Sequence, residues 1–195
     1  MDNYIGLCGN IASGKSTVAS ILERSNMNVI FEDFEKHICL DDFYNNPEGF
    51  SFETELNFLL QHYYFIKKVL KKSSSNLFDF SITLDRAYAD VTLSSNRKKL
   101  FHMVADELEE EIGLPSKIIF ICCPEEILID RIKKRNREFE KSITIDYLSA
   151  LTRSIENQIA LISKKTNVIK INSHEIDFLT DINNQKTIQS LILDK

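Results

Sequence analysis

The sequence predicts an α/β fold in which a doubly wound parallel sheet of five strands is flanked by helices. A glycine-containing loop over residues 9–17 follows a short apolar run and leads into a segment with helical spacing. Further apolar runs of strand length alternate with amphipathic segments in the rest of the chain. The 195 residues, 43% of them hydrophobic, are enough for one well-buried domain and few for two, so we expect a single domain over residues 1–195.

Charge and cysteine content narrow the class of protein. A formal net charge of -5 argues against a nucleic-acid-binding surface and favours small-molecule substrates. The cysteines have no metal-binding spacing and are interpreted as reduced, mostly buried thiols: Cys8, Cys39, Cys122 and Cys123. No charged-then-apolar segment precedes the first apolar run, and no run approaches the length of a membrane span. We therefore expect a cytoplasmic protein without membrane contact.

The first expected strand covers residues 4–8, and the loop after it reads Gly9-Asn10-Ile11-Ala12-Ser13-Gly14-Lys15-Ser16-Thr17. Glycines let backbone amides turn inward around phosphate oxygens, and the helix that follows begins with free N–H groups and a partial positive charge. Lys15 can reach the outer phosphates, and Ser16 can ligate magnesium. A degenerate pattern can match by chance, but here strand, loop and helix occur in the required order. They predict a P-loop that binds a nucleoside triphosphate.

Two further strands end in carboxylates. A β-rich apolar run over residues 28–31 ends at Glu32, and a short strand over residues 76–80 carries Asp79 near its end. The carboxyl ends of parallel strands face the ligand crevice, so Glu32 lies beside the phosphates if its strand neighbours the first strand. A general base belongs at this place, although a solvated carboxylate fits the position equally well. We expect Asp79, Glu32 and Ser16 at one rim.

Residues 52–70 have the apolar spacing of a long helix packed on a sheet. Glu55 and His62 are seven residues apart on one side of this helix. They either line a pocket or are exposed groups of an amphipathic helix. After the third strand, Ser81 fits a helix cap.

The second half of the chain continues the alternation of helices and strands. The apolar run over residues 117–123 suits a strand buried on both faces, so it is the best candidate for the sheet centre beside the P-loop strand. Helices are expected over residues 84–88, 97–111, 146–162 and 187–193, and a fifth strand over 167–171. A further helix begins at Pro124 and runs into a basic cluster that includes Arg131, Arg135 and Arg137. This cluster is either a solvated charged face or an Arg-rich lid that stabilises charge on a transferred phosphoryl group.

An ordered set of motifs makes the chain similar to the deoxynucleoside kinase family, which includes deoxycytidine, deoxyguanosine and deoxyadenosine kinases. The P-loop alone does not carry this resemblance, which runs from Tyr4 to about Phe178. The more specific segments are Glu32 after the second strand, Asp41-Asp42-Phe43-Tyr44, residues 52–58, Asp79-Phe80-Ser81, Asp85-Arg86-Ala87-Tyr88, residues 131–138 and residues 172–178.

The resemblance implies an ATP-dependent kinase that uses magnesium, and it implies a role for each matching residue. Glu32 takes the proton from the 5'-hydroxyl of a deoxynucleoside. The donor phosphates are held by the P-loop residues from Gly9 to Thr17, by Lys15, and by Arg131, Arg135 and Arg137. Asp177 and Phe178 lie near the adenine of the donor, and Ser16 and Asp79 organise magnesium. The sugar 3'-hydroxyl meets Tyr44 and Glu140, and the remaining substrate contacts come from Glu55, Phe58, His62 and Asp85. The family also implies a homodimer.

Three positions depart from the family pattern. Phe80 stands where an arginine is usual, so one positive group near the 5'-hydroxyl is missing. Glu55 stands where a glutamine is usual, and Asp33 replaces a proline. If Glu55 and Asp85 both face the base, they offer acceptors that need donors, so we expect a base with an amino group and thymidine as the poorest substrate. His62 or Arg86 must offset the paired charge, or one acid must bind a proton.

The leading hypothesis is therefore 5'-phosphorylation of a deoxynucleoside in nucleoside salvage. A second hypothesis is a P-loop kinase for another small alcohol or a monophosphate. A third, which Phe80 favours and Lys15, Glu32 and Arg135 argue against, is a catalytically weakened nucleotide-binding subunit that pairs with an active kinase.

Overall fold

The computed structural model of the chain describes residues 4–32, 39–70, 76–176 and 181–193. Its five strands form one parallel sheet in the order β2-β3-β1-β4-β5. The strands are β1 (Tyr4–Gly9), β2 (Asn28–Ile30), β3 (Asn76–Phe78), β4 (Lys117–Cys122) and β5 (Asn167–Asn172). The predicted doubly wound, five-stranded parallel sheet is confirmed, and β4 pairs with the P-loop strand as expected.

The helices follow the predicted order with shifted ends. They are α1 (Lys15–Glu23), α2 (Leu40–Asn45), α3 (Pro47–Leu70), α4 (Ile82–Thr92), α5 (Ser95–Ile112), α6 (Glu125–Arg135), α7 (Ile145–Ile162) and α8 (Ile182–Leu193), with the 3₁₀ helix η2 (Glu138–Glu140) between α6 and α7. Ser81 caps α4 as predicted, because its hydroxyl accepts a hydrogen bond from the Leu84 amide at 3.2 Å. Among the described residues, none of the helices is both long and apolar enough to cross a membrane.

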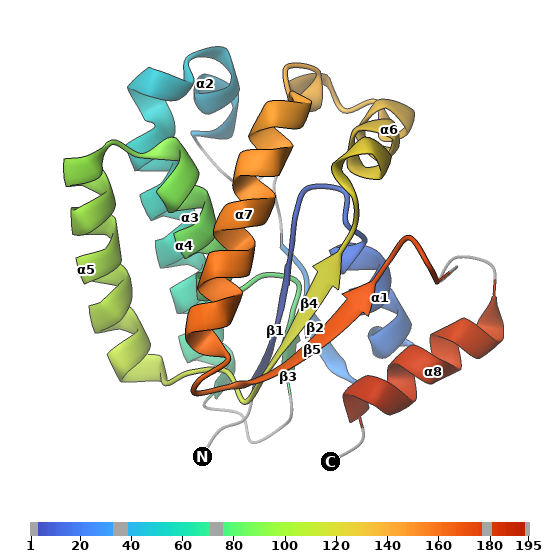
Figure 1. The fold of residues 1–195 in the computed structure, drawn as a ribbon. Coiled ribbons are helices and arrows are strands. Elements are labelled where there is room, and N and C mark those ends of the chain that lie inside the picture. Colours follow the sequence, from blue (N-terminus) through green and yellow to red (C-terminus); the bar gives the residue numbers. More distant parts are fainter. Residues whose placement is uncertain (1–3, 33–38, 71–75, 177–180, 194–195) are drawn as a thin grey trace.

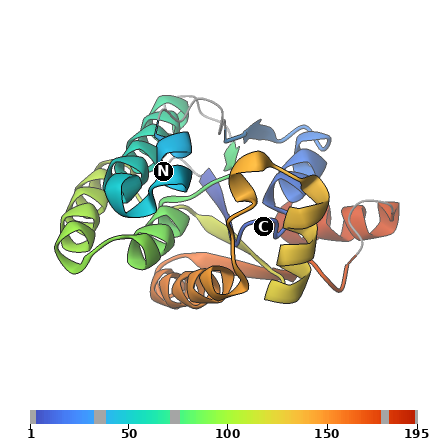
Figure 2. The ribbon, with the colours of Figure 1, turned by 90° about the horizontal axis from the view of Figure 1, so that it is seen from above.

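The sheet lies between two layers of helices (Figure 1). Helices α1 and α8 cover one face, and α3, α4, α5 and α7 lie on the other. Helices α2 and α6 stand at the end toward which the arrows of β4 and β5 point, and the view from above shows both of them over that end (Figure 2). The carboxyl ends of the strands therefore face α2 and α6, and residues of both helices line a cavity there.

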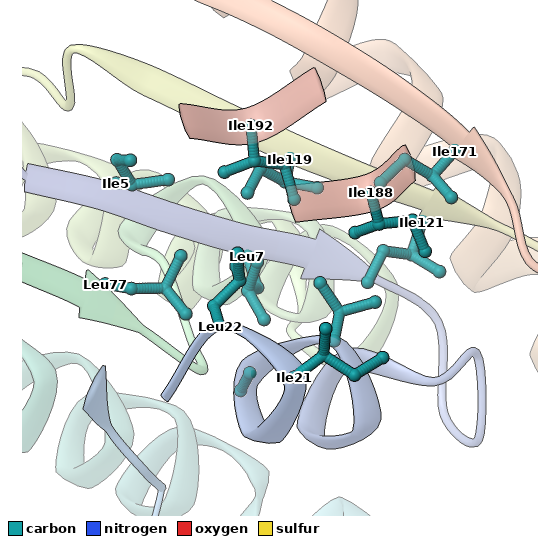
Figure 3. Close-up of a cluster of buried hydrophobic side chains, with 12 residues drawn as sticks. Ile5, Leu7, Ile21, Leu22, Leu77, Ile119, Ile121, Ile171, Ile188 and Ile192 are labelled. Atoms are coloured by element: carbon teal, nitrogen blue, oxygen red, sulfur yellow. The ribbon is translucent and has the colours of Figure 1, made fainter. Parts of the chain in front are cut away.

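The core explains why the central strands are nearly continuous apolar runs. Figure 3 shows isoleucines and leucines of β1, β4 and β5 packed against α1 and α8. On the other face, Phe78, Phe80 and Phe101 are fully buried between the sheet and the helices α3, α4 and α5. Because strands β1 and β4 have helices on both faces, both of their side-chain rows are apolar. Leu60 is an exception to the predicted apolar face of α3, since it is 50% exposed.

The strand order corrects one premise about Glu32. Strand β2 does not neighbour β1, because β3 lies between them. The sheet therefore brings Asp79, which follows β3, next to the P-loop strand, while Glu32 follows the edge strand. The amide of Asp79 donates to the carbonyl of Ile30 at 2.9 Å, which continues the pairing of β2 and β3 beyond the last bridge. Any role of Glu32 at the phosphates then depends on its side chain reaching across β3.

Candidate active site

A cavity of about 440 Å³ lies at the carboxyl ends of the strands. Among the residues predicted for the site, its lining includes Ile11, Ala12, Gly14, Lys15, Ser16, Thr17, Glu32, Glu55, Phe58, His62, Asp79, Asp85, Arg131, Arg135, Arg137 and Glu140. Gly9, Asn10 and Ser13 complete the P-loop behind this surface. Asp177, Phe178 and the side chain of Tyr44 lie outside the described part of the chain. The predicted residues thus converge on one cavity.

The P-loop needs its glycines for two different reasons. A side chain at Gly9 would come within 2.7 Å of the Ile121 carbonyl oxygen, so only glycine fits against β4. Gly14 has φ 109°, a left-handed conformation that side chains disfavour, and it places the first turn of α1 beneath the loop. Asn10 ties the loop to α7, because its amide nitrogen donates to the Leu148 carbonyl and to the Thr152 hydroxyl at 2.8 Å each. The loop is held rigidly before any ligand arrives.

Lys15 is curled back over the loop. Its Nζ donates to the carbonyl oxygens of Gly9 at 3.0 Å and Asn10 at 3.2 Å. Burial lowers the pKa of Lys15, while the carboxylates of Asp79 and Glu32 favour its charged form. The ammonium group therefore lies among backbone oxygens and acidic side chains at the N-terminus of α1, where a phosphate would replace the carbonyls as its partner.

Ser16 and Asp79 form the pair that suits a magnesium ion. The Ser16 hydroxyl donates to Asp79 Oδ2 at 2.7 Å. The second carboxylate oxygen, Asp79 Oδ1, is buried and has no hydrogen-bond partner among the described residues. Burial raises the pKa of Asp79 to about 6. Oxygen donors and an unsatisfied carboxylate oxygen fit the hard-cation chemistry of magnesium, which binds through few protein groups when it also binds phosphates. The described residues contain no cluster of three or more His, Cys, Asp or Glu side chains that could hold a metal by itself.

His62 lies between two carboxylates. Its Nδ1 is 2.9 and 3.0 Å from the two oxygens of Asp85, and its Nε2 is 3.1 Å from Glu32 Oε1. The imidazole is stacked on Phe80, with ring centroids 4.0 Å apart and an angle of 9° between the planes. Burial alone lowers the pKa of His62, but the contacts with Asp85 and Glu32 outweigh burial and raise it to about 10. The imidazole contacts the predicted general base, a contact that the sequence does not predict.

Glu55 lies deeper, on the α4 side of the cavity. It is 5% exposed, and its Oε1 is 2.8 Å from the hydroxyl oxygen of Thr92. Burial raises the pKa of Glu55 to about 8. The Thr92 hydroxyl is also 3.0 Å from the carbonyl oxygen of Tyr88, and its single hydrogen serves only one of the two acceptors. When Thr92 donates to the carbonyl, Glu55 must donate to Thr92, and only a protonated carboxyl can do so.

The two acids, Glu55 and Asp85, differ in their partners. Asp85 lies 2.9 Å from His62 Nδ1, and burial favours the protonated form of Glu55 by raising its pKa to about 8. Arg86 does not take part, since its guanidinium contacts Glu109, Asp106 and His102 of α5. Glu55 and His62 are both buried, so the alternative in which they are exposed groups of an amphipathic helix is wrong.

The three arginines of the basic cluster have two different sets of contacts. Arg131 binds the back of the P-loop, where it donates to the carbonyls of Ala12 and Ser13 at 3.2 and 3.1 Å and to the Ser173 carbonyl at 2.9 Å. Arg135 is paired with the buried carboxylate of Glu140, with Nε 2.6 Å from Oε2, and Arg137 approaches the same carboxylate at 3.7 Å. All three arginines line the cavity, and Arg131 also holds the P-loop through its backbone carbonyls.

The sequence assigns no role to Tyr88, which belongs to one of the motifs, or to Thr92, although both lie at the site. Tyr88 lines the cavity, and Thr92 holds Glu55. Asp85, Tyr88 and Thr92 are spaced by three and four residues, which places them on one face of α4. In the sequence, only this spacing indicates that Tyr88 and Thr92 lie on the same side of the helix as Asp85. Tyr147 of α7, which also lines the cavity, has no such signal.

The thiols do not belong to the catalytic centre. The four cysteines are free; Cys8 is buried, whereas Cys39, Cys122 and Cys123 are partly exposed. The prediction that they are reduced agrees with the absence of a disulfide among them, and the prediction that they are mostly buried is wrong for three of the four.

Comparisons with known proteins identify a family and relatives of the chain. The family model described as deoxynucleoside kinase matches residues 5–195. The chain is 31% identical over 188 residues to a deoxyguanosine kinase of Bacillus subtilis (strain 168), with 90% of this chain and 89% of the relative covered. It is 26% identical over 178 residues to a deoxyadenosine kinase of Dictyostelium discoideum, with 88% and 73% covered.

Solved structures support the fold. The structure of a deoxyadenosine kinase from M. mycoides with bound dATP superposes with a TM-score of 0.81, at 19% identity, and covers 98% of this chain and 97% of that chain. The same enzyme with bound dCTP gives a TM-score of 0.79 over the same shares of the two chains.

Proposed function

Because the chain belongs to the deoxynucleoside kinase family, we propose that it transfers the γ-phosphoryl group of ATP to the 5'-hydroxyl of a deoxynucleoside. The observation that carries this proposal is the arrangement of Glu32, Lys15 and the Ser16–Asp79 pair around one cavity. A proton acceptor, a phosphate-binding cation and a magnesium site are the parts that phosphoryl transfer to an alcohol requires. The proposal covers residues 1–195 as one catalytic domain.

In the proposed reaction, Glu32 accepts the proton of the 5'-hydroxyl as the 5'-oxygen bonds to the γ-phosphorus and the bond to the leaving ADP oxygen breaks. Lys15 and the P-loop amides hold the donor phosphates, and Arg135 and Arg137 face the charge that develops on the transferred group. Magnesium, held by Ser16, Asp79 and phosphate oxygens, would neutralise part of the phosphate charge. The protein contributes mainly positioning and electrostatic stabilisation.

We infer that the preferred substrate carries an amino group on its base. The Glu55 carboxyl accepts from the Thr92 hydroxyl through Oε1 and keeps acceptor capacity in either protonation state, and the oxygens of Asp85 are acceptors as well. Adenine, cytosine and guanine present amino hydrogens. Thymine presents one ring N–H between two carbonyls, which would meet other acceptors. The deoxyguanosine and deoxyadenosine kinases among the relatives act on amino-bearing bases, in agreement with this choice.

The remaining roles are proposed from the resemblance to the family. Tyr44 and Glu140 are proposed for the sugar 3'-hydroxyl, and Glu140 is buried beside the lid arginines. Asp177 and Phe178 are proposed for the donor adenine. The net charge of -5 supports a partner other than nucleic acid, and the free thiols support a reducing compartment such as the cytoplasm. The homodimer stays an expectation from the family.

A product analysis tests the proposal. Purified protein is incubated with magnesium, ATP and each of the four common deoxynucleosides, and the products are separated by chromatography; unrelated alcohols and nucleoside monophosphates are added as further acceptors. We expect 5'-monophosphates of deoxynucleosides only, and none with the Lys15→Ala variant. A product from another alcohol or a monophosphate acceptor alone would favour the second hypothesis. ATP binding without any product would favour a regulatory subunit, which is the reading that Phe80 suggests.

A further inference from the structure

The imidazole of His62 has both nitrogens directed at carboxylates. Nδ1 faces Asp85 and Nε2 faces Glu32, at distances between 2.9 and 3.1 Å. An ionised carboxylate only accepts hydrogen bonds, and a neutral imidazole has a single N–H. Both contacts can be hydrogen bonds at once only if both nitrogens carry a proton. The geometry therefore describes an imidazolium between two carboxylates.

The surroundings keep this ring in place. His62 is 2% exposed in the middle of α3, and the fully buried ring of Phe80 covers one of its faces in parallel stacking. Phe58 approaches at 5.9 Å between ring centroids with a tilt of 50°. Asp85 on α4 contacts the far nitrogen through both of its oxygens. The imidazole thus has its orientation determined by two helices and by the segment after β3.

Glu32, by contrast, has little support from its own backbone. It lies beyond the end of β2, an edge strand of three residues. Its side chain is nevertheless only 10% exposed and reaches the cavity across β3. Among the described residues, a hydrogen bond with His62 links this carboxylate to the helical layer.

We propose that His62 is a positioning residue for Glu32: its imidazolium, held by Asp85 and Phe80, binds one carboxylate oxygen and leaves the other for the substrate hydroxyl. The inference rests on the proposed function of Glu32 as the base. It gives His62 a role beside the substrate contact that the resemblance implies. It also explains Phe80, which stands where the family pattern has an arginine. The ring of Phe80 stacks on the cationic imidazole of His62.

A kinetic experiment tests the proposal. His62→Gln keeps the length and polarity of the side chain but cannot carry the charge. We expect kcat to fall about 10- to 100-fold, because a carboxylate displaced by about 1 Å loses that much rate, with the KM for ATP within twofold of the unmodified protein. The matched control is His102→Gln, which removes a histidine paired with Asp90 at 2.8 Å between α5 and α4, outside the cavity. Equal kcat values for the two variants would overturn the proposal.

A double variant separates positioning from a general loss of structure. If His62 acts through Glu32, the variant Glu32→Gln/His62→Gln is no slower than Glu32→Gln alone, within twofold. A further tenfold loss in the double variant would mean that His62 acts elsewhere, and would overturn the proposal.

A spectroscopic measurement is independent of turnover, so it stays decisive if the protein shows no kinase activity. Imidazole ¹⁵N shifts distinguish protonated from free nitrogens, and the four histidines of the chain can be assigned with His62→Gln. We expect both nitrogens of His62 to be protonated at pH 8, and Nε2 to shift in Glu32→Gln while Nδ1 shifts in Asp85→Asn. A neutral tautomer of His62 at pH 8 would overturn the proposal, whereas absent activity with a protonated His62 would count against the proposed function alone.

Discussion

Replacing Glu55 with Gln is expected to stabilise the protein near pH 8 and to lose this effect in acid. Glu55 is 5% exposed on α3, and burial, helped by nearby Asp85, raises its pKa from 4.5 to about 8 in the folded protein. Between these two pH values the unfolded chain has released the proton and the folded protein has kept it. The free energy of unfolding therefore decreases as pH rises through this window, and the full stability is present only below about pH 4.5.

The size of the effect follows from the pKa values. The window from 4.5 to about 8 spans about 3.5 pH units, and each unit corresponds to about 1.4 kcal/mol, so the upper limit is about 5 kcal/mol at pH 8. Gln has nearly the same shape and no proton to lose. The difference in the free energy of unfolding between Glu55→Gln and the unmodified protein should grow by up to about 1.4 kcal/mol per pH unit between pH 5 and 7.5.

Urea denaturation at pH 5.5, 6.5 and 7.5 measures this difference directly. The matched control is Glu53→Gln, which changes an exposed acid two residues away on the same helix. We expect the stability of this control to run parallel to that of the unmodified protein. If the difference for Glu55→Gln is the same at all three pH values, burial does not raise the pKa of Glu55, and the argument that Glu55 keeps a proton in the folded protein fails.

Three further predictions concern activity. Glu32→Gln should bind nucleoside nearly unchanged while turnover falls by roughly two to four orders of magnitude, as steady-state kinetics and equilibrium binding will measure; near-normal turnover would remove Glu32 from the mechanism. Lys15→Ala should weaken both ATP binding and the rate, because the ammonium group acts on the phosphates before and during transfer, and an unchanged ATP affinity and kcat would contradict this role. Thymidine should have the lowest kcat/KM of the four deoxynucleosides, and Glu55→Gln should shift the ranking toward thymidine by about 1–3 kcal/mol, the cost of one buried hydrogen-bond mismatch. Thymidine as the best substrate of the unmodified enzyme, or an unchanged ranking in the variant, would refute the assignment of Glu55.

Local patterns in the sequence are sufficient to predict the fold. The order of strand, glycine loop and helix predicts the P-loop because each of these pieces depends on neighbouring residues only. The continuous apolar run of β4 predicts a strand covered on both faces, and β4 does pair with β1 at the centre. The order of the outer strands cannot be predicted in this way, because no local pattern indicates that β3 lies between β1 and β2. For this reason the sequence does not predict that Glu32 follows a strand separated from β1 by β3.

The chemistry of the site depends on contacts that join distant parts of the chain. The spacing of Glu55 and His62 shows that they share one side of α3, but amphipathic helices also carry such residues in water. They are buried because α4 packs against α3 on that side, and this packing brings Asp85 to His62 and Thr92 to Glu55. The two carboxyl groups therefore have different partners, an imidazole for Asp85 and a hydroxyl for Glu55.

Phe80 has a different significance in the folded chain than in the sequence. Read along the sequence, a phenylalanine in place of an arginine removes a positive charge beside the reacting groups and favours a weakened enzyme. In the folded chain, Phe80 lies flat against His62, whose pKa of about 10 makes it cationic at neutral pH. A positive group is therefore present beside Glu32 after all, supplied by a helix that precedes Phe80 in the chain. An arginine at position 80 would put a second positive group against the His62 imidazole, whereas the apolar ring of Phe80 stacks on it, so the loss of the arginine is not by itself evidence of lost catalysis.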